Sequence, residues 1–174
     1  KQIDLLLIAL LLPVQQVAFY KLAASFAEKI WFLSGIHHLL ITRVASNKKK
    51  YGADLTARLF KNTFWLMTIC AIGAYFTASF IISLVYGSEY LSVIDPFKLL
   101  LPGIVFLGAC SSLSQYFIGN DLVGWTNFVY LASAVLNIIL NLILIPKFGI
   151  TGAAIATSIT YVLSTVVMII LFIS

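Results

Sequence analysis

The segment 126–172 constrains the fold most strongly, because it contains two apolar stretches of nearly membrane-spanning length. Only five residues, from Ile145 to Gly149, join these two stretches. A helix needs about 20 mainly apolar residues to cross the hydrocarbon core of a bilayer. Backbone polar groups inside that core must be paired within the protein, which favours helical spans. Similar stretches fill most of the remaining chain, so the sequence predicts an integral membrane protein.

The composition supports this class. Of the 174 residues, 61% are hydrophobic and 10% are charged, whereas about 25% of a typical soluble domain is charged. The net charge of +5 does not indicate a nucleic-acid partner, because the basic residues concentrate in one loop, as in cytoplasmic membrane loops. Cys70 and Cys110 both lie in apolar stretches, where we expect small buried side chains and neither a disulfide nor a metal site.

Six apolar segments predict an all-α, polytopic bundle of six membrane spans. Pro13 ends the first of them, and the pair Pro102-Gly103 predicts a kink near the start of the fourth. The first apolar run is short and the chain ends directly after another, so we expect a fragment of a longer membrane protein. The spans are predicted at about residues 3–12, 17–42, 63–86, 97–118, 125–145 and 150–173.

The loops predict the orientation of the spans. Six of the eleven basic residues lie in the loop 43–61, which we therefore expect on the cytoplasmic side. The lysine run 48–50 within it mainly indicates which side of the membrane the loop occupies. Its second expected role is contact with anionic lipids. Alternation then assigns the remaining connections, with segments 86–96 and 146–149 outside, and segment 119–124 and both chain ends inside.

The second predicted span is the most polar and carries the first candidate site. Lys21, Ser25 and Glu28 are spaced i, i+4 and i+7, which places them on one helical face. Ionisable groups at membrane depth usually face a bundle interior or a water-filled cavity, where these residues would contact an anionic head group or a coupling ion. Alternatively, this helix end lies at the interface, where Lys21 extends to water and Glu28 pairs with Lys29. We expect Glu28 to face the protein interior or its cavity and not lipid.

Other polar residues give weaker signals. We expect Asp4 to be a boundary charge near the cytoplasmic end of the first span, with a cavity residue as the alternative. Ser111 and Gln115 form a short polar face in the fourth span. A longer stripe in the fifth is expected mainly to hydrogen-bond to neighbouring helices, with a polar pathway as the alternative. The stripe consists of Thr126, Tyr130, Ser133, Asn137 and Asn141.

Small residues at the start of the sixth span predict close helix packing. Gly149 with Ala153, and Gly152 with Ala156, are small-xxx-small pairs that let backbones approach. No Rossmann glycine motif, P-loop, HExxH or CxxC motif occurs in the sequence. We therefore expect no enzyme activity, no catalytic residue, no metal site and no cofactor.

Several segments resemble bacterial polysaccharide flippases, and the resemblance covers nearly the whole chain. The most specific part is 146–161, which begins Pro-Lys-Phe-Gly-Ile-Thr-Gly-Ala-Ala. Asp4 precedes a segment that is similar to the start of the second lobe of that family. The similar segments are Val17-Ala-Phe-Tyr-Lys-Leu-Ala23, Tyr86-Gly-Ser-Glu-Tyr90, Pro96-Phe-Lys-Leu-Leu-Leu-Pro-Gly103 and the stretch 137–161.

The resemblance implies the multidrug/oligosaccharidyl-lipid/polysaccharide exporter superfamily, whose members have twelve or more helices in two lobes around a central cavity. It implies that this chain is the second lobe, in the bacterial cytoplasmic (inner) membrane. The implied function is translocation of a lipid-linked oligosaccharide, such as an O-antigen repeat unit for lipopolysaccharide, by alternating access. The implied partners are membrane lipids, a polyprenyl-diphosphate-linked oligosaccharide and an N-terminal lobe. Lys21 would contact the pyrophosphate, and the coupling ion would be a proton or sodium.

Other functions stay open at the level of the sequence. Within the superfamily, the alternatives are a drug/cation antiporter and a peptidoglycan-precursor flippase. Buried Arg and Lys in the other lobe would favour a lipid phosphate as substrate, whereas buried acids would favour a cation. From other classes, a membrane-embedded glycan polymerase would need a charged cluster in a large outer loop, which this sequence lacks. The last alternative is a non-transporting scaffold subunit.

Overall fold

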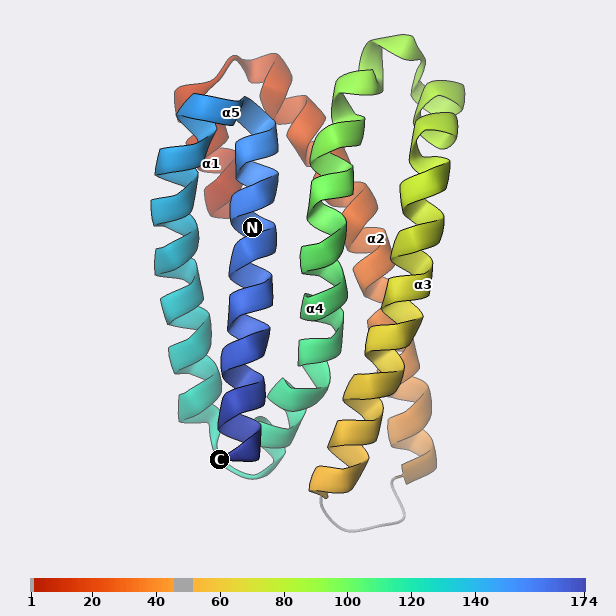
Figure 1. The fold of residues 1–174 in the computed structure, drawn as a ribbon, viewed down its shortest axis with the longest axis vertical. Helices are drawn as coiled ribbons and strands as arrows, with labels where there is room; N and C mark the ends of the chain where they lie inside the picture. The colour runs from red at the N-terminus through yellow and green to blue at the C-terminus, as the bar shows by residue number, and fades with distance from the viewer. Residues whose placement is uncertain (1, 46–51) are drawn as a thin grey trace.

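The computed structural model describes residues 2–45 and 52–174, and the described residues contain helices and short turns without any strand. This confirms the predicted all-α class. The helices lie along one elongated bundle (Figure 1). In chain order they are α1 (Gln2–Leu11), α2 (Val14–Ala45), α3 (Ala53–Tyr86), the 3-10 helix η1 (Ser88–Val93), α4 (Ile94–Gly119) and α5 (Val123–Ile173).

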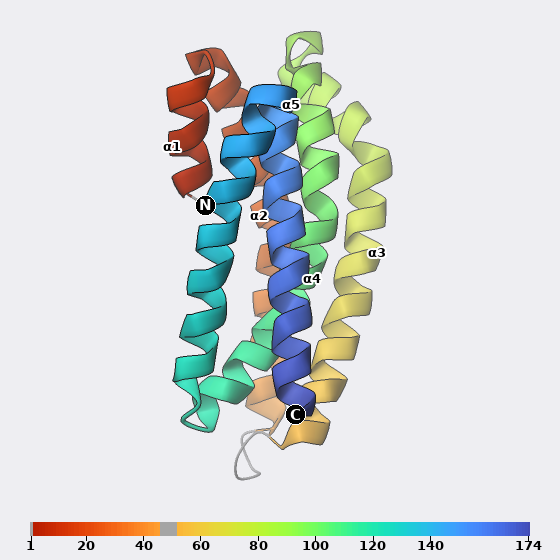
Figure 2. The same ribbon diagram turned by 60° about the vertical axis from the view of Figure 1, so that its left-hand side comes forward.

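α5 is a helical hairpin, not one straight rod. Gly149 has φ 61° and ψ −139°, a conformation that breaks the helix and that glycine adopts without steric penalty. The chain reverses there, and the two halves of α5 lie side by side in both views (Figures 1 and 2). The predicted break between the fifth and sixth spans at 146–149 is therefore confirmed.

Among the described residues, three segments are long and apolar enough to cross a membrane. They are Ala53–Tyr86, Ser88–Gly119 and Val123–Ile173, and the last contains the reversal at Gly149. α4 is the most central of them, because 67% of its most apolar stretch is buried, against 17% in each of the other two. Large apolar side chains such as Phe76 are exposed on α3, as expected for a surface that faces lipid.

Two predicted boundaries are wrong. The predicted loop 43–61 is helical at both ends, because α2 continues to Ala45 and α3 already begins at Ala53. Lys, Arg, Leu and Ala are all good helix formers, so a helix can extend beyond its apolar stretch. Part of the predicted outer loop 86–96 forms η1 and the start of α4. The lysine run 48–50 lies outside the described residues.

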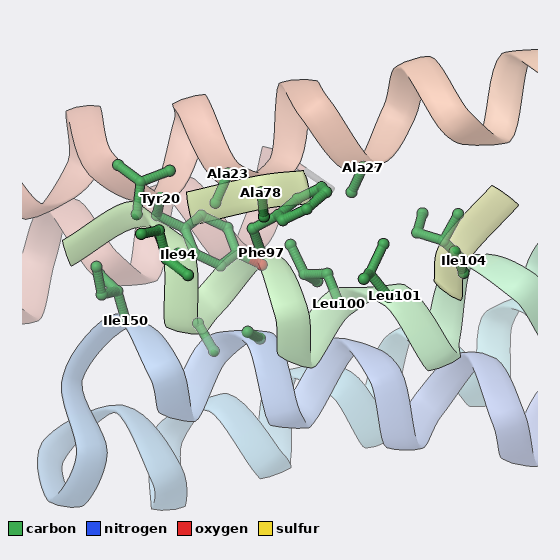
Figure 3. Packing of buried hydrophobic residues seen from close by; sticks show 14 of the residues in the cluster. Tyr20, Ala23, Ala27, Ala78, Ile94, Phe97, Leu100, Leu101, Ile104 and Ile150 are labelled. Atoms are coloured by element: carbon green, nitrogen blue, oxygen red, sulfur yellow. The ribbon is translucent and has the colours of Figure 1, made fainter. Parts of the chain in front are cut away.

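The core lies where α4 packs against α2 and against the second half of α5. A Cβ atom on Gly103 of α4 would lie 2.7 Å from Cα of Ser158, so only glycine allows this approach of the two backbones. The Ser158 hydroxyl donates a hydrogen bond to the Leu99 carbonyl of α4. Between α2 and α4, Figure 3 shows the buried side chains of Tyr20, Ala23, Ala27, Phe97, Leu100 and Ile104.

Candidate functional site

Asp4 is the one charged side chain that is buried among the described residues, with an exposed fraction of 3%. It lies in the first turn of α1, and α1 starts partway along the bundle, well away from either end (Figure 1). The expectation of a boundary charge at the end of a span is therefore wrong. The short α1 packs beside the α5 hairpin, toward the end at which the chain reverses (Figure 2). The apolar pattern of α1 alone does not specify this position.

Both carboxylate oxygens of Asp4 accept hydrogen bonds from α5. Asn141 Nδ2 donates to Asp4 Oδ1 at 2.9 Å and to Asn137 Oδ1 at 2.9 Å. Thr157 Oγ1 donates to Asp4 Oδ2 at 3.3 Å. The Tyr20 hydroxyl of α2 lies 3.3 Å from Thr157 Oγ1. We call Asp4, Asn137, Asn141 and Thr157 the Asp4 cluster; it joins α1 to both halves of α5.

The α5 hairpin brings the members of the cluster together. Asn137 and Asn141 are four residues apart and share a helical face. Thr157 reaches the same place because the chain reverses at Gly149. The two halves approach closely at Gly152, where an added Cβ would lie 2.6 Å from the Leu144 carbonyl carbon. The close packing predicted from the small residues is thus confirmed at Gly152.

The cluster is rich in oxygen donors. Asn141 Oδ1 is buried and has no hydrogen-bond partner among the described residues, and such a group costs about 1–3 kcal/mol. If the Asn141 amide turned by 180°, this oxygen would face Asp4 in place of the nitrogen. Asp4, Asn137, Asn141 and Thr157 would then offer carboxylate, carbonyl and hydroxyl oxygens, which suit hard cations. No group of three or more His, Cys, Asp or Glu occurs among the described residues, so the donor set does not resemble a transition-metal site.

Two cavities adjoin Asp4. The first has a volume of about 140 Å³ and lies between α1, α2, α4 and α5; its polar lining consists of Asp4, Tyr20, Glu28, Thr157 and Tyr161. The second has a volume of about 170 Å³, and its lining includes Asp4, Ser133, Asn137, Thr160 and Ser164. Asp4 therefore lies between two spaces with hydroxyl, amide and carboxylate groups in their walls.

The structure separates the three residues of the predicted face on α2. Glu28 is exposed at the surface of the chain and lines the 140 Å³ cavity together with Asp4. Ser25 is half-buried, and Lys21 is exposed. Neither is among the residues that line this cavity. The structure thus brings Glu28 and Asp4 to one space and leaves Lys21 outside it.

The polar stripe of α5 does form the predicted interhelical bonds at two positions. Asn141 bonds to Asp4 of α1, and the Tyr130 hydroxyl lies 2.6 Å from Ser114 Oγ of α4. Thr126 Oγ1 is buried with no partner among the described residues. On α4, the Ser111 hydroxyl donates to the Gly108 carbonyl at 2.6 Å. Gln115, also on α4, is half-buried.

Sequence reasoning missed the roles of Tyr20 and Thr157. Thr157 stood among small residues that indicated packing, and Tyr20 adjoins the more conspicuous Lys21. The available signal was a hydroxyl in an otherwise apolar stretch. Such hydroxyls commonly bond to their own helix backbone, so this signal alone does not identify a site.

The fold and the Asp4 cluster define a helical membrane protein with an ionisable group held inside its bundle. No protein-family model matches the chain, and no solved structure matches it. Over 111 residues, the chain is 31% identical to an uncharacterized membrane protein of Methanocaldococcus jannaschii. The matched segment is 64% of this chain and 21% of that protein, so the chain spans about a fifth of its relative. This similarity agrees with the membrane-protein class.

Proposed function

We propose that the chain is one lobe of a cation-coupled exporter of lipid-linked oligosaccharides in a bacterial cytoplasmic membrane. The lobe has six membrane passes, two of which are the halves of α5. The observation that supports cation coupling is that Asp4 is buried and hydrogen-bonds to both halves of α5. Ionisable residues inside membrane bundles are costly, and they mark ion pathways, proton relays and substrate sites. The resemblance to polysaccharide flippases supports the substrate class.

The cluster can couple cation binding to helix position. Asp4 holds the negative charge, while Asn141 and Thr157 fix its two oxygens from opposite halves of α5. A bound proton or sodium ion supplies the positive charge that neutralises Asp4. Neutralisation removes the cost of keeping a bare carboxylate inside the bundle, so it favours the arrangement in which Asp4 is buried between α1 and α5. A ligand shifts a conformational equilibrium by its difference in affinity between the two states, so Asp4 can bias the rocking of one lobe against the other.

The oligosaccharide lipid would bind between this lobe and an N-terminal lobe. Lys21 is exposed on α2 and is available to contact a pyrophosphate there. A drug/cation antiporter of the same superfamily is the second candidate function. It is favoured by one observation: among the described residues, the buried charge is an acid, and none is Lys or Arg.

The test compares Asp4→Asn with Asp95→Asn in the full-length protein, produced in a bacterial strain that lacks its own flippase. Asp95 is an exposed acid at the start of α4, so it is a matched control. We expect Asp4→Asn to abolish surface glycan at normal protein abundance, while Asp95→Asn restores it. Normal glycan with Asp4→Asn would refute the coupling role. Cation-dependent drug resistance without glycan export would favour the antiporter.

The lobe assignment has its own test. The 174-residue chain expressed alone should not restore surface glycan, because alternating access needs a second bundle on the other side of the site. Co-expression with an N-terminal lobe should restore it. Restoration by the chain alone at a normal rate would refute the half-transporter assignment and would require a homodimer.

The orientation is tested by labelling with an impermeant thiol reagent in intact cells. The basic loop 43–61 is expected on the cytoplasmic side. A cysteine in place of Ser88, at the opposite end of the bundle, should therefore react, and one in place of Lys49 should not. The reverse pattern would show that the topology is inverted.

A further inference from the structure

Asp4 and Glu28 share one cavity although they lie on different helices. Asp4 is at its buried end, and Glu28 is exposed on α2. Tyr20 of α2 and Tyr161 of α5 line the same cavity. The cavity therefore has an acid at a buried position, an acid at an exposed position, and hydroxyl groups in the wall between them.

The cavity has room for water. Its volume of about 140 Å³ is several times the roughly 30 Å³ that one water occupies in the liquid. A buried water needs two to four polar partners, and the lining includes the hydroxyls of Tyr20, Thr157 and Tyr161 beside the two carboxylates. The rest of the lining is apolar, and Figure 3 shows Ala27, Leu100 and Ile104 between α2 and α4. Low-dielectric walls strengthen the field of the charges that they enclose.

The charge in the cavity lining has one sign. Neither Lys nor Arg is among the lining residues. The basic residue next to Glu28 is Lys29, whose Nζ lies 5.2 Å from the centre of the Phe26 ring. Two carboxylates on one low-dielectric cavity repel each other, and a cation between them removes that repulsion. The space should therefore attract cations and exclude anions.

We infer that Glu28 is the entry site of this cavity: it captures a cation at the exposed face of α2 and delivers it to Asp4 through the hydrated space. Glu28 then sets the charge selectivity of access, while the Asp4 cluster holds the cation. The inference rests on the proposed cation coupling, which it extends to a second residue and a route.

The experiment uses cysteines on α2 of the full-length protein, with Cys70 and Cys110 replaced by alanine. Ala24 lines the cavity, whereas its neighbour Ala23 is buried in the core with an exposed fraction of 0%. Each is changed to cysteine in turn. Each protein is then treated with cationic aminoethyl methanethiosulfonate and with anionic sulfonatoethyl methanethiosulfonate, which modify thiols in contact with water.

We expect Ala24→Cys to react much faster than Ala23→Cys, with the cationic reagent preferred. Adding Glu28→Gln should reduce that preference about tenfold, because residues four apart on a helix have Cβ atoms about 5–6 Å apart and a charge acts strongly at that range. Glu28→Asp should retain the preference. Glu89→Gln is the matched control, since Glu89 is an exposed acid in η1, and should change nothing.

Two results would overturn the inference. An unreactive cysteine at position 24 would show that the cavity holds no water, and an unchanged preference with Glu28→Gln would show that Glu28 does not control access. Surface glycan is measured in parallel with Asp4→Asn. If Asp4→Asn exports normally while Glu28→Gln loses the cationic preference, the proposed coupling fails and the entry site stands. If Asp4→Asn abolishes export while Glu28→Gln keeps the preference, the entry site fails and the coupling stands.

Discussion

Both halves of α5 are mainly apolar, but their polar side chains have different kinds of hydrogen-bond partner. In the second half, most hydroxyls donate to carbonyl groups of the backbone. In the first half, Asn141 and Tyr130 bond to side chains of other helices. Thr157 is the exception of the second half, because its hydroxyl reaches Asp4. The backbone-bonded hydroxyls are those of Thr151, Ser158, Thr160, Ser164 and Thr165. They donate in turn to the carbonyls of Phe148, Leu99, Ala156, Tyr161 and, for Thr165, both Tyr161 and Phe106.

This difference distinguishes packing from a site. A hydroxyl that bonds to a carbonyl of its own helix has a partner in any helix, so its presence says little about function. Ser158 and Thr165 also reach carbonyls of α4, where the two helices pack closely. Side chains that depend on one another form a network that fails when one member is removed. Asn141 Oδ1, which has no partner among the described residues, belongs to the network. We therefore expect substitutions at Asp4 and at its two direct donors, Asn141 and Thr157, to change cation binding. Substitutions at the backbone-bonded hydroxyls should change stability alone.

The largest effect is expected for Asn141→Leu. Asp4 loses its 2.9 Å donor, and hydrogen bonds to charged groups contribute about 1.5–3 kcal/mol. We expect a loss of about 3 kcal/mol in the free energy of unfolding of the full-length protein in detergent, and a loss of about 10–100-fold in cation affinity. Asn127→Leu, an exposed site on the same half of α5, should change neither quantity. If Asn141→Leu left cation affinity unchanged, Asn141 would contribute to helix packing and not to cation binding.

The next largest effect is expected at the close contact between α4 and α5, which serves helix packing. Gly103→Ala introduces a Cβ 2.7 Å from Cα of Ser158, and overpacking of this kind costs about 1–3 kcal/mol. Gly73→Ala on α3 is the matched control, because no atom lies within 4 Å of its added Cβ. It should stabilise the protein by up to about 1 kcal/mol, since alanine favours helix. Equal thermal shifts in the two variants would contradict the close contact.

These contacts also show which parts of the structure the sequence predicts. The break at Gly149 and the close approach at Gly152 follow from local residue types, and both are confirmed. The depth of Asp4 does not follow, because it depends on where α1 packs along α5. The link between Thr157 and Asp4 requires the register of the α5 hairpin, which the apolar pattern leaves free. The predicted boundaries of the loop 43–61 are wrong because good helix formers extend α2 and α3 beyond their apolar stretches.

A smaller effect is expected for Ser158→Ala, which tests a hydroxyl of the packing class. Ser158 loses one hydrogen bond to the Leu99 carbonyl, and one such bond contributes about 0.5–1.5 kcal/mol. Thermal unfolding should shift accordingly, while cation affinity and export stay unchanged. A loss of cation affinity in this variant would break the comparison, since it would make a backbone-bonded hydroxyl part of the site.

The smallest effect is expected for Asn137→Leu. Asn137 is half-buried, and its Oδ1 accepts a bond from Asn141 within the same helix. Bonds of this kind in membrane interiors contribute about 0.6 kcal/mol on average, so thermal stability should fall modestly and export should stay largely intact. Asn137 is linked to the Asp4 cluster through its bond to Asn141, whereas Asn141 and Thr157 donate to Asp4 itself. Loss of export at unchanged stability and abundance would make Asn137 a direct cation ligand and would extend the site along α5 toward Ser133.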